Sequence, residues 1–150
     1  MAGNIESDFA ICDATCKRIV ERHGNDAIAT NFSEEERVVA LVWSVSGVVE
    51  NGGFRYLLGT LPPGDPYLEH TINAFEKIGC YDAVKAIKEA LCLFPKCKPP
   101  EEKHLRIAEY ESHSEETRDA IDSRFWDQID NITKLLADYI REEKNRGRLF

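Results

Sequence analysis

Residues 33 to 49 read SEEERVVALVWSVSGVV, and this stretch decides the fold class. Ser33 followed three positions later by Glu36 is the pattern of a capping box, in which each side chain bonds the other residue's backbone N–H at a helix start. The three consecutive glutamates there are favoured by the positive end of the helix dipole. The valine-rich run that follows also suits a β-strand, but the cap and an unbroken length of about 17 residues favour a buried helix.

Outward from this stretch, apolar residues recur at helical spacing through most of the chain. Asp65 followed by Pro66 predicts a further helix start behind a proline-rich loop, and Gly79 is placed to end that helix. The first expected helix carries an apolar stripe formed by Phe9, Cys12, Cys16, Ile19 and Val20. The expected helical segments are about residues 5–22, 33–49, 66–78, 83–94 and 121–140. We therefore predict an all-α protein in which residues 1–150 form a single compact domain of about five to seven helices.

Residues 50 to 54, ENGGF, interrupt the apolar pattern and pose a choice between a turn and a ligand-binding loop. A phosphate-binding loop would need G-x-G-x-x-G after a strand, or a lysine and a hydroxyl residue after the last glycine, and neither pattern occurs here. Asparagine and glycine tolerate the left-handed backbone that ends a helix. We predict a structural turn formed by Asn51, Gly52, Gly53 and Phe54.

The same motif resembles the signature of a bacterial domain family of unknown general function whose name-giving member is a DNA-mimic protein. In that family the motif closes a long apolar helix, and a helix with Ile-Gly, an alanine-rich helix ending in Phe-Pro and a final amphipathic helix follow. The matching segments here are Ile78-Gly79, Ala83 to Ala90, Phe94-Pro95 and Trp126 to Ile140, which includes the pair Tyr139-Ile140. The resemblance covers about residues 35–145, and the chain departs from the family pattern at Tyr56, Leu57, Leu58 and Thr60. It implies an all-helical fold and binding to a DNA-binding protein.

The net charge of −8, from 27 acidic and 19 basic residues, limits the kinds of partner. A chain this acidic is not expected to bind nucleic acid or an anionic membrane directly, and it favours basic proteins. The N-terminus has no basic segment followed by a long apolar one, and no apolar run reaches the roughly 18 residues of a membrane span. We therefore predict a cytoplasmic protein whose five cysteines are reduced.

Nearly all of the surplus charge lies in residues 101–143, which hold 13 acidic and 6 basic residues, a net charge of −7. The residues predicted to bind a partner form the densest part of this stretch: Glu109, Glu111, Glu115, Glu116, Asp119, Asp122, Asp127 and Asp130. As one helix they would span about 33 Å, over which duplex DNA carries about 19 phosphates, so a mimic would need further acids such as Glu34, Glu35 and Glu36. The alternative is an ordinary solvated face with pairs such as Arg118 and Asp122 at i, i+4.

Cysteine and histidine spacings offer little support for metal or thiol chemistry. The pairs Cys12–Cys16 and Cys92–Cys97 raise the alternative of structural zinc, but the first pair lies on the apolar stripe of an expected helix. Cys97 lies between two lysines, which could activate a thiol. No histidines have the H-E-x-x-H spacing. We predict no metal, no cofactor and no catalytic residue.

The function predicted from these patterns is non-enzymatic: an acidic helical surface that binds a basic protein, such as a DNA-binding regulator or a nuclease, and acts as a DNA mimic. One alternative is a small-molecule-binding or enzymatic helical domain with a pocket near Trp43, Asn51, Phe54 and Tyr56. Another is an immunity-type inhibitor of a basic toxin, which would use the same acidic surface.

Overall fold

The computed structural model describes residues 7–150, and these residues form seven α-helices, a short 3-10 helix and connecting loops, with no strand among them. This confirms the predicted all-α domain of five to seven helices. The helices are α1 (Asp8–His23), α2 (Glu34–Gly59), α3 (Glu69–Lys77), α4 (Tyr81–Leu91), α5 (Lys103–Glu111), α6 (Glu115–Trp126) and α7 (Ile129–Asn145), and the 3-10 helix η2 is Pro95–Cys97.

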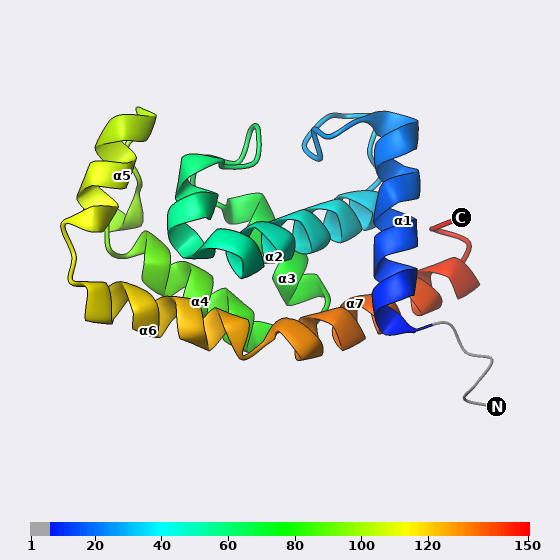
Figure 1. The fold of residues 1–150 in the computed structure, drawn as a ribbon. Coiled ribbons are helices and arrows are strands. Elements are labelled where there is room, and N and C mark those ends of the chain that lie inside the picture. Colours follow the sequence, from blue (N-terminus) through cyan, green and yellow to red (C-terminus); the bar gives the residue numbers. More distant parts are fainter. Residues whose placement is uncertain (1–6) are drawn as a thin grey trace.

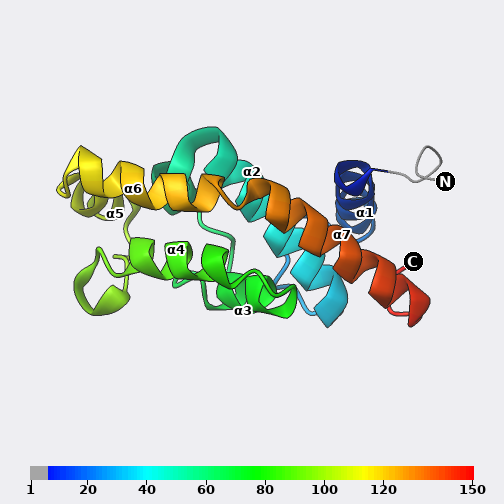
Figure 2. The ribbon, with the colours of Figure 1, turned by 90° about the horizontal axis from the view of Figure 1, so that it is seen from below.

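Helices α6 and α7 lie end to end along one side of the molecule (Figure 1). The residues that join them, Asp127 and Gln128, keep right-handed helical backbone angles, so the chain direction changes little. Helix α2 packs against α6 and α7 from within, while α1 crosses α7 at one end and α5 lies at the other. Seen from below, α4 and α3 run beside the α6–α7 pair (Figure 2). One face of α6 and α7 therefore covers the core and the opposite face is left to solvent.

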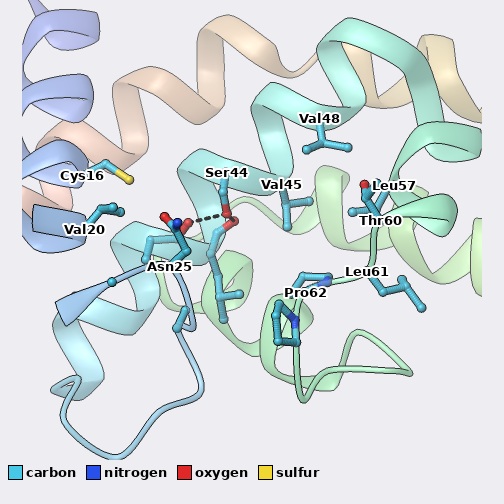
Figure 3. A pocket seen from close by; sticks show the side chains of 15 residues that line it. Cys16, Val20, Asn25, Ser44, Val45, Val48, Leu57, Thr60, Leu61 and Pro62 are labelled. Carbon is cyan, nitrogen blue, oxygen red and sulfur yellow. Dashed lines mark hydrogen bonds between the residues drawn. The ribbon is translucent and has the colours of Figure 1, made fainter.

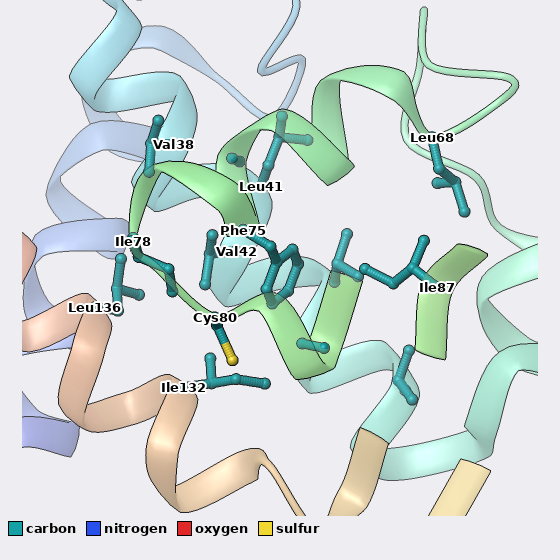
Figure 4. Packing of buried hydrophobic residues seen from close by; sticks show 14 of the residues in the cluster. Val38, Leu41, Val42, Leu68, Phe75, Ile78, Cys80, Ile87, Ile132 and Leu136 are labelled. Carbon is teal, nitrogen blue, oxygen red and sulfur yellow. The ribbon is translucent and has the colours of Figure 1, made fainter. Parts of the chain in front are cut away.

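The hydrophobic core is centred on aromatic side chains contributed by α2, α3 and α6. The ring of Phe125 packs edge-on against Phe54 at 5.6 Å and against Phe75 at 5.9 Å. Aliphatic side chains from α2, α4 and α7 surround Phe75 (Figure 4). All three aromatic side chains are fully buried, and burying each contributes roughly 1.5–3 kcal/mol to the free energy of unfolding.

Most helix signals in the sequence match the structure, but the segment predicted as one helix over about residues 121–140 is divided between α6 and α7, and α5 was not among the expected segments. The capping box is present, because Ser33 and Glu36 each bond the other's backbone N–H. Helix α3, however, begins at Glu69 and not at Pro66, because Leu68 takes a left-handed backbone conformation. The buried carboxylate of Asp65 still caps this helix, accepting the backbone N–H groups of His70 and Thr71 at 2.9 Å each. In α1 the middle of the predicted stripe, Cys12, Cys16 and Ile19, is buried, whereas Val20 is half-buried and Phe9 is exposed.

The cysteines correct the prediction that all five thiols are reduced, because Cys92 and Cys97 form a disulfide. The other three, Cys12, Cys16 and Cys80, are free and buried. Burial raises the pKa of Cys16 to about 11 and that of Cys12 to about 12. The sequence did not reveal this disulfide, because an odd number of cysteines does not indicate which of them are paired.

We expect native protein to resist alkylation at every cysteine until reductant is added, and then to gain two labels, on Cys92 and Cys97. The three buried thiols stay protonated and covered, whereas the disulfide lies on the surface. Intact-mass measurement checks this. More than two labels on folded, reduced protein would contradict it.

Replacing both disulfide cysteines with serine should lower the free energy of unfolding by at most about 2 kcal/mol, the loop-closure value for so short a loop.

Candidate protein-interaction surface

The ENGGF segment breaks helix α2 at one residue, Gly53, whose φ of 68° and ψ of −171° are open essentially to glycine alone. A second helical segment begins at Phe54 and continues to Gly59. Its first backbone N–H, that of Phe54, donates to the carboxylate of Asp122 on α6 at 2.9 Å. A Cβ on Gly53 would collide with that carboxylate. The motif therefore joins α2 to α6 through a backbone–carboxylate contact.

Asp122 is half-buried, and its carboxylate stabilises the contact between α2 and α6 by accepting the Phe54 N–H. Burial raises the pKa of its carboxyl group, although the hydrogen bond from Phe54 opposes the effect. Because folding raises this pKa, the ionised carboxylate is less favourable in the folded chain than in the unfolded one. Its contribution to stability is therefore full at low pH and declines as pH rises through the raised pKa.

Replacing Asp122 with asparagine or with alanine is expected to have opposite effects. Asparagine keeps an oxygen that accepts from the Phe54 N–H and removes the buried charge, so at pH 7 the variant should be at least as stable as the parent. Alanine leaves that N–H without an acceptor and should cost about 1–3 kcal/mol. Urea unfolding at pH 4.5 and pH 7 checks both, and the advantage of asparagine should shrink at the lower pH. An alanine variant as stable as the asparagine variant would contradict this.

The structure divides the eight acidic residues predicted to bind a partner into two groups. Three have internal contacts or partial cover: Asp122 bonds Phe54, Glu111 pairs with Arg55 at 2.7 Å, and Glu109 is half-buried. The other five are exposed on α6 and at the start of α7, and we call them the acidic ridge: Glu115, Glu116, Asp119, Asp127 and Asp130.

The carboxylates of the acidic ridge form no ion pairs with the nearby arginines, because those arginines bond to other groups. Arg124 makes two hydrogen bonds to Glu89 on α4, at 2.9 and 2.6 Å. Arg118 donates to the backbone carbonyl of His113 at 3.1 Å, and not to Asp122 as the spacing suggested. Within residues 7–150, no ridge carboxylate lies in an ion pair. The ridge therefore presents charge that neighbouring side chains do not neutralise.

The length of the ridge sets how closely it can imitate DNA. From Glu115 to Asp130 a helix rises about 22 Å. One DNA strand carries about six or seven phosphates over that distance, and the duplex about twice as many. Five carboxylates approach the charge density of one strand and fall well short of the duplex. Glu34 was predicted to extend such a surface. It lies instead on another part of the molecule, where it pairs with Lys77 at 3.1 Å.

One aromatic side chain, Trp126, lies within the ridge. It was predicted to belong to the apolar stripe of the final helix. Trp126 is 44% exposed, and its indole N–H donates to the backbone carbonyl of Val49 at 2.8 Å. This hydrogen bond fixes the orientation of the ring against α2. Tryptophan is one of the residues enriched among those that contribute most to binding at protein interfaces.

A protein-family model described as DMP19-like protein matches residues 30–143. The chain belongs to the DMP19-like family. The family takes its name from DNA mimic protein 19, so the resemblance carried by the ENGGF segment and the helices that follow it is confirmed. No curated protein and no solved structure matches the chain.

In this DMP19-like chain, the residues proposed for a small-molecule pocket do not converge. Phe54 is buried in the core and Tyr56 is half-exposed, whereas Trp43 lines a groove that runs along α2 as far as Glu50. A second groove lies between α1, α2 and the proline-rich loop (Figure 3). Its lining is mostly apolar, and the hydroxyl of Ser44 there donates to the carbonyl of Ala40 at 2.6 Å.

Across residues 7–150, no three histidine, cysteine, aspartate or glutamate side chains are grouped so that they could hold a metal ion. In the same part of the chain, no helix combines the length and apolar character needed to cross a membrane. The cytoplasmic location stays a prediction.

Proposed function

We propose that this chain is an acidic protein-interaction domain that binds a basic DNA-binding protein in place of DNA. The observation that supports this most is the acidic ridge, which presents five carboxylates without ion-pair partners along one exposed side of α6 and α7. Membership of the DMP19-like family supports the same function. This surface fits a regulator or a nuclease whose lysines and arginines contact the phosphates of one DNA strand.

The binding should depend on both charge and packing. The ridge carboxylates attract a basic surface over roughly a Debye length, which raises the association rate and makes binding sensitive to salt. Trp126 supplies apolar area that salt does not screen. The complex should therefore weaken as salt rises without vanishing.

Affinity capture from the source cell tests this function. The protein is immobilised, lysate is applied at low salt, and bound proteins are eluted either with salt or with a short DNA duplex and identified by mass. We expect a basic DNA-binding protein that the duplex elutes. Bound proteins that salt releases but DNA does not would count against mimicry, because they would use a surface other than their DNA site.

A further inference from the structure

A groove of about 420 Å³ lies between α1, α2 and α7, at the end of the acidic ridge. The rings of Phe9 and Trp43 form one wall, and their centroids are 5.2 Å apart in an edge-to-face arrangement. Two carboxylates also line it, Glu50 from α2 and Asp130 from α7. Asp130 is a ridge residue as well, so the groove and the ridge are one continuous surface. Phe9 is 61% exposed, although it belongs to the apolar stripe of α1.

The charge inside this groove is unbalanced. A third carboxylate, Asp13, is already paired with Lys17 at 2.9 Å and accepts the indole N–H of Trp43 at 3.3 Å. Glu50 and Asp130 have no ion-pair partner among residues 7–150. Two negative charges beside aromatic rings make a setting that favours a cation, because the ring faces attract positive charge and the carboxylates accept its hydrogen bonds.

An unpaired hydroxyl is a second feature of this groove. Ser46 lines the groove, is only 5% exposed, and its hydroxyl has no hydrogen-bond partner in the described part of the chain. Buried polar groups are nearly always paired. The Ser46 oxygen has almost no solvent-accessible surface, so a donor in the groove reaches it only if the side chains around it shift.

We propose that this groove receives an arginine side chain of the basic partner. The inference rests on the proposed function and adds to it the side chain that the partner contributes. A guanidinium group stacks on aromatic rings and offers five N–H donors in a planar fork, enough for Glu50 and Asp130 together. A lysine ammonium holds its water more strongly and cannot stack, so arginine fits this lining better.

A small probe tests the groove without the unidentified partner. N-acetyl-arginine methylamide is titrated into ¹⁵N-labelled protein, with the neutral isostere N-acetyl-citrulline methylamide as control. The readout is the indole N–H resonance of Trp43, distinguished from that of Trp126 by a Trp126→Phe variant. We expect a saturable shift of the Trp43 resonance with the arginine probe and at least about tenfold weaker binding of the citrulline probe, since only the first is charged.

Two variants separate the groove from the ridge. Gly47 is a residue of α2 that lines the groove, and a Cβ there would meet nothing within 4 Å. Gly47→Leu should therefore fill the groove without disturbing the fold. It should weaken arginine binding at least about tenfold. A four-site ridge variant, with Glu115→Gln, Glu116→Gln, Asp119→Asn and Asp127→Asn, leaves the lining intact and should change it by less than about threefold.

Equal shifts with the arginine and citrulline probes, or arginine binding that survives Gly47→Leu, would overturn the inference. The proposed function fails by a different result, the capture of proteins that DNA does not elute. The two experiments therefore fail separately.

Discussion

Replacing Gly53 with alanine is expected to lower the free energy of unfolding by about 3 kcal/mol or more. The backbone there has a φ of 68° and a ψ of −171°, and holding alanine in such a conformation costs about 1–3 kcal/mol. The new Cβ would also collide with the carboxylate of Asp122. Moving that carboxylate breaks its hydrogen bond to the Phe54 N–H, which adds about 1–3 kcal/mol for an unsatisfied backbone group. Urea unfolding measures the sum.

Gly47→Ala is the matched control, because it makes the same chemical change in the same helix. Gly47 lies inside a continuous helical segment where a Cβ meets open space. Alanine should therefore raise the free energy of unfolding by about 0.5–1 kcal/mol. If alanine at Gly53 and alanine at Gly47 shifted stability in the same direction, the break in α2 would not need glycine, and the structural explanation of the ENGGF motif would be wrong.

The four-site ridge variant is expected to weaken binding to the captured partner at least about tenfold at low salt. Removing four exposed charges reduces the attraction that steers the encounter and lowers the salt dependence of affinity. Titration calorimetry at two salt concentrations measures both effects. The two affinities should converge as salt rises, because salt screens what the variant has lost.

A second four-site variant controls for net charge alone. It neutralises exposed carboxylates on α1, on α3 and in the loop before α5, with the substitutions Glu21→Gln, Glu69→Gln, Glu76→Gln and Glu101→Gln. It should retain most of the parent affinity. Equal losses from the two variants would show that overall charge, and not the ridge, drives binding.

Local signals in the sequence predicted the helices well. The capping box at Ser33 and the apolar run behind it depend only on residues within a few turns of one another, so helix α2 could be located without any tertiary information. The start of α3 could not. The carboxylate of Asp65 reaches its backbone donors across a left-handed turn at Leu68, and that conformation has no clear sequence signature.

The acidic surface was only partly predictable for the same reason. Asp122 follows the buried Ile121 and precedes the buried Phe125 by three positions, so helical phase alone places it near the core face. Glu111, in contrast, is paired with Arg55, 56 positions away in sequence, and such a contact follows only from the packing of α5 against α2. The arginine groove draws its lining from three helices, so no single stretch of sequence reveals it.

Competition between this protein and DNA for the captured partner tests the central claim most directly. A complex of the purified partner with labelled duplex DNA is titrated with this chain, and fluorescence anisotropy follows the bound DNA. We predict that the DNA is released completely, at a protein concentration that rises in proportion to added unlabelled duplex. A stable ternary complex of partner, DNA and this chain would show that the acidic ridge does not occupy the DNA site, and would contradict mimicry.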